Sequence, residues 1–178
     1  MTNSTGYYGL DPIGPKDPNS IFPFDVDNAS TEIFLNSMVK LVADKGVAAS
    51  TAGDISIGVA VGFLDPDGMP QPHYWHGGSS AQAAWKCMVN IKRDQVYKVK
   101  CTTAYAASDV GLCTDIVIGT GDSVSGISGD YVVTLSTIAA SLMVIGLVED
   151  GNNAWGANQD LLVVINENAF LAAGPAGI

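Results

Sequence analysis

Along much of the chain after residue 54, branched apolar residues alternate with small or polar ones, a pattern typical of β-strands. In residues 55–63, ISIGVAVGF, this alternation predicts a strand with one closely packed face. The following Asp65-Pro66-Asp67-Gly68 predicts a tight turn, because proline fixes φ and glycine accepts a positive φ. Residues 71–75 are then expected to return as the partner strand of a hairpin.

A second hairpin is predicted from residues 85–92 and 95–101, with Arg93 and Asp94 at its turn. Side chains of successive residues on a strand point to opposite faces of the sheet. One face of the second strand carries Val96, Lys98 and Lys100, and the other carries Tyr97, Val99 and Cys101. We expect the lysines to point outward, where they would also discourage aggregation through a strand edge.

The remaining strands are shorter. They are predicted at residues 33–35, 39–42, 115–118, 131–135, 142–148 and 161–166. Glycine and serine dominate residues 119–129, which predicts a flexible or irregular loop, and residues 149–153 predict a turn. Together these segments predict an all-β fold, with residues 29–178 forming a single β-barrel or β-sandwich domain.

Residues 1–28 differ from the rest because they hold four of the eight prolines. Prolines at this spacing argue against a helix and against a central strand. The segment also carries aromatic residues that need a place to pack, namely Tyr7, Tyr8, Phe22 and Phe24. We therefore expect an extended Pro-rich N-terminal arm whose aromatic side chains bind a neighbouring subunit. A loose terminus is the alternative.

The net charge of the chain and the positions of its basic residues limit the kinds of molecule that it is expected to bind. The 178 residues include 8 Lys and Arg against 18 Asp and Glu, a formal net charge of −10, so nucleic acid is not expected as a partner. Five of the eight basic residues lie between Lys86 and Lys100, and none follows Lys100. A cationic stripe beside an acidic remainder suits docking against charged neighbours, and Lys98 and Lys100 would then contact a partner. Simple solubility explains the same charges equally well.

Other features bear on the compartment. The first residues, MTNSTGYYGLDP, lack the basic and apolar regions of a signal peptide. The longest apolar-rich stretch, residues 138–148, is too short to span a bilayer, so no membrane partner is expected. Three cysteines without a CxxC pair fit synthesis in a reducing cytoplasm.

Both histidines of the chain lie in residues 72–78, PHYWHGG. His73 and His76 are three residues apart, so on a strand they would point to opposite faces, and a zinc ion would need further ligands. We expect no metal here. The segment is interpreted as a contact loop at the end of a hairpin, with Tyr74 and Trp75 as its contact residues.

Ser123 lies in a Gly-Asp-Ser block that also occurs in some serine hydrolases. Such enzymes need a histidine to activate the serine, and no histidine follows His76 in this chain. The Walker pattern of a phosphate-binding loop is also missing. No catalytic residue and no cofactor are therefore expected.

A resemblance emerges from short phrases that occur in order between residues 29 and 168. They are TEIF (31–34), GDISIGVAVGF (53–63), HYW (73–75), SDVGL (108–112), the 119–129 loop, VIGLVEDGNN (144–153) and LVVINE (162–167). Together they resemble head decoration (cement) proteins of tailed bacteriophages, which are capsid-stabilising structural proteins. The long Pro-rich arm and the anionic C-terminal half depart from that group.

The resemblance implies a non-enzymatic virion structural protein on the capsid exterior, made in the host cytoplasm. Its partners would be the major capsid protein lattice and neighbouring copies of itself, with a closed trimer as first choice and a dimer as second. Deleting residues 1–28 would then leave the β domain folded but weaken capsid binding. Two alternatives remain: a tail or fibre module that binds host glycan through residues 72–78, and a small hydrolase that uses Ser123.

Overall fold

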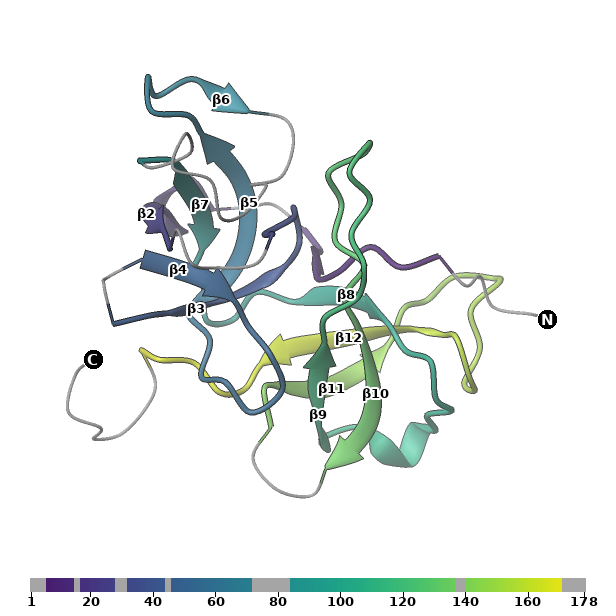
Figure 1. The fold of residues 1–178 in the computed structure, drawn as a ribbon. Helices are drawn as coiled ribbons and strands as arrows, with labels where there is room; N and C mark the ends of the chain where they lie inside the picture. Colours follow the sequence, from purple (N-terminus) through teal and green to yellow (C-terminus); the bar gives the residue numbers. More distant parts are fainter. Residues whose placement is uncertain are drawn as a thin grey trace.

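The computed structural model describes residues 6–14, 17–27, 32–43, 46–71, 84–136 and 140–170. The predicted all-β fold is confirmed: the described chain forms a closed five-stranded barrel and a curled sheet, joined by turns and two short 3₁₀ helices (Figure 1). Within these ranges no helix has the length and apolar character needed to cross a bilayer.

The barrel occupies the first half of the chain. Its five strands are β2 (Ile21–Val26), β3 (Met38–Leu41), β4 (Gly46–Ala49), β5 (Gly58–Leu64) and β7 (Lys86–Asn90), and the short β6 (Pro70–Gln71) pairs with β5 outside the ring. The strand order is β3-β4-β2-β7-β5-β6, and an additional pairing of β3 with β5 closes the ring. The predicted hairpin between β5 and β6 is present, and Gly68 at its turn has the expected positive φ of 79°.

The curled sheet occupies the second half. Its strands are β8 (Tyr97–Lys100), β9 (Cys113–Val117), β10 (Tyr131–Ser136), β11 (Leu142–Leu147) and β12 (Asp160–Ile165), and β1 (Asp11–Pro12) joins its edge. The order is β1-β8-β12-β11-β9-β10, and a bridge between Cys101 and Val132 brings β8 and β10 together. These strands follow the expected alternation: on β12, Leu161, Val163 and Ile165 are buried between half-buried neighbours.

The barrel and the curled sheet share part of their cores. Met38 of β3 and Val59 of β5 belong to the same buried cluster as the inward residues of the curled sheet. A second cluster, which includes Ile33, Val47 and Phe63, fills the barrel. The two sheets are therefore in direct apolar contact.

The predicted hairpin of residues 85–92 with 95–101 is wrong. β7 pairs with β2 and β5 in the barrel, whereas β8 pairs with β1 and β12 in the curled sheet. The chain between them crosses from one sheet to the other, and it is held by the N-terminal segment. The Ile91 N–H donates to the Ser20 carbonyl at 2.9 Å, and the Gln95 side chain donates to the Ile13 carbonyl at 2.8 Å.

The expectation of an arm that lies apart from the β domain is also wrong for the described residues 6–14 and 17–27. Leu10 is fully buried, and β1 pairs with β8. β2 is an interior strand between β4 and β7, the position that its proline had been expected to exclude. The two strands of this segment therefore pair within the two sheets.

The position of Pro23 explains how β2 tolerates a proline. The Val26 N–H donates toward β7, to the Trp85 carbonyl, and the Asp27 N–H donates toward β4, to the Val47 carbonyl. By alternation, the nitrogen of Pro23 faces the β4 side. β4 pairs only with Asp25 and Val26, so the missing N–H interrupts no ladder.

Candidate functional site

Four of the residues expected to contact a partner have contacts within their own chain. The Tyr8 hydroxyl donates to Oδ1 of Asp160 at 2.5 Å, and Lys100 forms an ion pair with the same carboxylate. The Lys98 ammonium lies 4.6 Å from the centre of the Tyr8 ring. Tyr7 stacks on Tyr131 with ring centres 4.9 Å apart. These contacts fasten the N-terminal segment to the curled sheet.

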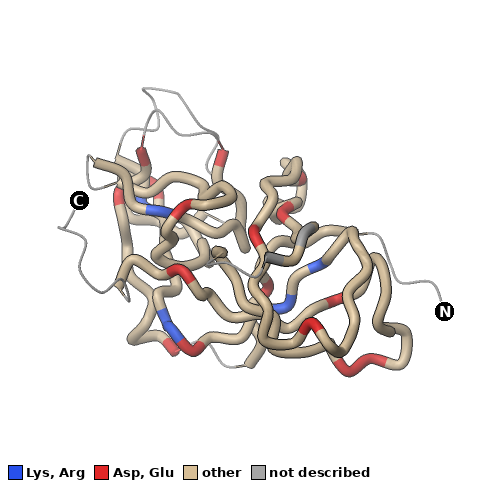
Figure 2. Tube along the Cα trace, turned by 90° about the horizontal axis from the view of Figure 1, so that it is seen from below, with Lys and Arg blue, Asp and Glu red and all other residues tan. Residues whose placement is uncertain are grey.

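The two lysines show where sequence alternation succeeds and where it fails. Tyr97, Val99 and Cys101 are fully buried, as the face assignment predicts. Lys100, however, is only 2% exposed, because the N-terminal segment covers its face of the sheet. Burial, and then the hydrogen bond to Asp160, raises the pKa of the Tyr8 phenol. Lys100 is thus part of an internal polar cluster and not of a surface stripe. Along the described chain, lysine and arginine are few and acidic residues are more numerous (Figure 2).

The other four residues predicted to contact a partner are Phe22, Phe24, Tyr74 and Trp75. Phe24 packs against the barrel core, whereas Phe22 is 46% exposed and stays a candidate contact. Tyr74 and Trp75 lie outside the described residues, as do His73 and His76.

A different feature projects from the curled sheet: the β9–β10 loop, defined as residues 118–130, which rises beyond β9 and β10 in Figure 1. The sequence predicted a flexible or irregular loop here, and the structure shows a hydrogen-bonded one. The Asp122 carboxylate accepts the Val124 N–H and the Ser125 hydroxyl, both at 2.9 Å. The Gly126 N–H donates to the Asp122 carbonyl at 2.7 Å, and the Asp122 N–H donates to Ile127 at 3.0 Å.

The β9–β10 loop is also anchored to the barrel side of the molecule. Leu35 donates its N–H to the Gly126 carbonyl and accepts the Ser128 N–H, each at 2.9 Å. Near the two ends of the loop, the backbones of Gly119 and Gly129 are in contact. A Cβ on Gly119 would overlap the carbonyl of Gly129. A tight backbone approach of this kind needs glycine, so the glycines serve packing more than flexibility.

This rigid loop holds an apolar side chain in solvent. Val124 is 82% exposed, the highest value among the large hydrophobic residues described. The hydrogen bond from the Val124 N–H, followed by that from Ser125, lowers the pKa of Asp122. The tip therefore combines a hydrogen-bonded backbone, a carboxylate with a lowered pKa and an apolar side chain, which suits contact with another surface.

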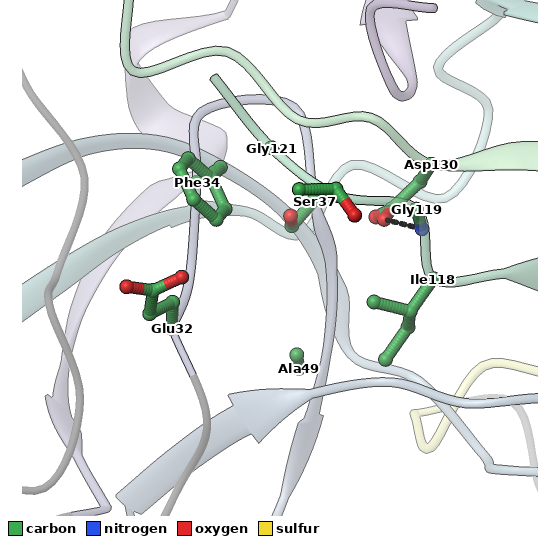
Figure 3. Close-up of a pocket in the computed structure, with 9 residues that line it drawn as sticks. Glu32, Phe34, Ser37, Ala49, Ile118, Gly119, Gly121 and Asp130 are labelled. Carbon is green, nitrogen blue, oxygen red and sulfur yellow. Dashed lines mark hydrogen bonds between the residues drawn. The ribbon is translucent and has the colours of Figure 1, made fainter. Parts of the chain in front are cut away.

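A pocket of about 280 Å³ lies at the base of the loop, where it meets the chain that leads into β3 (Figure 3). Phe34 and Ile118 provide apolar wall, and Glu32 also lines the pocket. Asp130 and Ser37 line another part of the wall, and Oδ1 of Asp130 accepts the Gly119 N–H at 3.2 Å.

Asp130 is an unusual carboxyl because it is only 3% exposed. Its burial raises the pKa to about 6, although hydrogen bonds from Ser128, Gly119 and Ser37 act in the opposite direction. These donors are all neutral, so the negative charge is solvated by dipoles and not by a cation. The group links the loop to the start of β3 and titrates near neutral pH.

The alternative of a hydrolase that uses Ser123 depends on the residues around this serine, of which Asp122 is the preceding one. The Asp122 carboxylate is engaged by the Val124 backbone and the Ser125 hydroxyl, so it caps the turn. In the described part of the chain, no group of three or more His, Cys, Asp or Glu residues is placed to hold a metal ion. Sequence reasoning missed the order of this loop, although the Asp122-to-Val124 spacing of an aspartate-capped turn could have indicated it.

Comparisons with known protein families, with curated proteins and with solved structures found no match. The site must therefore be interpreted from its own geometry.

Proposed function

We propose that this chain is a structural protein of a tailed-phage particle, which decorates the outside of the head and stabilises the major capsid protein lattice without catalysing a reaction. The observation that carries the proposal is the ordered β9–β10 loop, which presents Val124 to solvent on a rigid stem. That loop is also one of the phrases on which the resemblance to decoration proteins rests. A presented apolar side chain on a preorganised backbone favours binding because little ordering is needed on contact.

A second line of support is the construction of the molecule. The barrel and the curled sheet share core residues, and the N-terminal segment pairs with both. A protein that binds only the assembled shell stabilises it by mass action, and a body whose parts already pack together needs little ordering on binding. We further propose a closed trimer, with a dimer as second choice, because repeated contacts at a lattice symmetry axis multiply the effect.

The test is co-sedimentation of purified protein with mature heads that lack it, followed by thermal disruption of the loaded and unloaded heads. We expect saturable binding and a higher disruption temperature for loaded heads. The number of copies bound at saturation, divided by the number of symmetry axes, gives the oligomeric state on the lattice. Failure to sediment with the heads at any concentration would contradict the proposal, as would a turnover signal from an activated ester that Ser123→Ala abolishes.

A further inference from the structure

The two most exposed large hydrophobic side chains in the described residues lie on turns built in the same way. They are Val124, 82% exposed, at the tip of the β9–β10 loop, and Met69, 61% exposed, in the turn between β5 and β6. These turns belong to different sheets, yet both project toward the same end of the molecule in Figure 1. We call them the two prongs: residues 65–69 and residues 122–127.

In each prong an aspartate carboxylate fixes the backbone that carries the apolar residue. In the first, Oδ1 of Asp65 accepts the Asp67 N–H at 3.0 Å and the Met69 N–H at 2.9 Å. In the second, Oδ1 of Asp122 accepts the Val124 N–H at 2.9 Å. Hydrogen bonds from Met69 and from Val124 lower the pKa of the respective carboxyls, so both stay ionised.

The charge of the prongs identifies the chemistry of the surface that would fit them. Asp65, Asp67 and Asp122 are their ionisable residues. Lysine and arginine do not occur anywhere in residues 55–71 or 101–136, which include both prongs and the strands that support them. An apolar tip beside ionised carboxylates is complementary to an apolar pocket bordered by cationic side chains.

We propose that the two prongs dock together on a protein surface that offers two apolar pockets bordered by lysine or arginine. This inference rests on the proposed function, in which that surface belongs to the major capsid protein lattice. Val124 and Met69 are the anchors that enter the pockets, and the aspartates set orientation and encounter rate. Because the turns are already ordered, docking costs little backbone entropy.

The experiment measures binding to mature heads for the full-length wild type, Val124→Ser, Met69→Ser and the double variant. The matched control is Val110→Ser, since Val110 is 45% exposed and follows the 3₁₀ helix η3 (Ala107–Asp109), the short coil at the opposite end of Figure 1. We expect each prong variant to weaken binding by about tenfold and the double variant by about a hundredfold, with wild-type melting temperatures throughout. The control variant should bind like wild type.

Charge is tested by Asp67→Asn, because the turn uses the Asp67 backbone N–H, which asparagine retains. Binding of this variant should be weaker and should fall less steeply as salt rises. If wild type binds the heads and the double variant binds equally well, the two-prong inference is wrong while the proposed function stands. If wild type does not bind, both are wrong.

Discussion

Asp130 places a carboxylate where water hardly reaches, at the point where the β9–β10 loop meets the lead into β3. It receives hydrogen bonds from neutral groups, including the Gly119 N–H at 3.2 Å. Burial still dominates and raises its pKa from 3.8 to about 6. The folded state therefore binds a proton at Asp130 more tightly than the unfolded chain does.

This difference makes stability depend on pH. Since the folded pKa is the higher one, the contribution of Asp130 is fully present below about pH 4 and is lost as pH rises through 6. A rise from 3.8 to about 6 corresponds to roughly 3 kcal/mol in the free energy of unfolding. We expect urea unfolding between pH 4 and 7 to show this decline in wild type, whereas Asp130→Asn should remove it.

Asp65 and Asp122 act in the opposite direction, because their pKa values are lowered and their contributions fade only as pH falls below the ordinary aspartate range. The difference between wild type and Asp130→Asn in the pH 4 to 7 interval therefore reports on Asp130, since both proteins keep the same histidines. Parallel curves for wild type and Asp130→Asn would show that this carboxyl is not buried as described.

At the residue scale, the sequence assigned faces correctly but could not predict what covers them. The alternation around Lys100 placed Tyr97 and Val99 inside, where they are. Nothing in that alternation could indicate that Tyr8, ninety-two positions earlier in the printed sequence, covers the opposite face. The same holds for Asp130, whose carboxylate accepts hydrogen bonds from both Ser37 and Gly119, far apart in the chain.

At the scale of elements, the conformation of the β9–β10 loop depends on backbone contact between its two ends. A Cβ on Gly129 would overlap the carbonyl of Thr120, and the backbone there cannot easily move aside. We expect Gly129→Ala to lower the free energy of unfolding by about 1–3 kcal/mol, the usual cost of forcing extra atoms into a packed site.

Gly151 provides a matched control, because a Cβ there meets nothing within 4 Å. Gly151→Ala should leave stability unchanged or raise it by about 0.4–1 kcal/mol through the unfolded state. Chemical denaturation of both variants measures the difference. Equal stabilities for the two variants would mean that the loop ends are not in contact.

Local pairings were predictable at this scale and distant ones were not. The β5–β6 hairpin follows from a four-residue turn whose chemistry is visible in the sequence. β7 and β8 looked like a hairpin because they are neighbours in the chain, but β2 and β12 offered better partners far away. β4 was not predicted because Gly46–Ala49 has only four residues, three of them glycine or alanine, and shows no alternation of apolar and polar positions.

Across the whole molecule, the N-terminal segment connects the two sheets. β2 is interior to the barrel and β1 completes the edge of the curled sheet, with Leu10 in the core between them. The sequence suggested that this segment could be deleted without loss of the β domain. The structure argues for the opposite outcome, because removing β2 opens the barrel between β4 and β7.

We therefore predict that deletion of residues 1–27 prevents folding. The stabilising free energy lost with an interior strand and a buried leucine exceeds the free energy of unfolding of a domain of this size, which is roughly 5–15 kcal/mol. Circular dichroism and amide NMR dispersion of the truncated protein provide the measurement, and deletion of residues 1–5, which removes neither β1 nor β2, is the control. A cooperative melt of the longer truncation would show that the barrel closes without β2.

The pairing of the N-terminal segment with both sheets also determines when, during synthesis, its strands can find their partners. β2 leaves the ribosome early but meets β7 only after residue 90, and Tyr8 must wait for Asp160, 152 positions later. Contacts between such distant residues slow folding, because a large loop has to close before any of them stabilises the chain. The first two strands thus wait until about half of the chain has been made before β7 and β8 can pair with them. Fast translation, or a chaperone that shields an N-terminal segment, should raise the yield of native protein from cells.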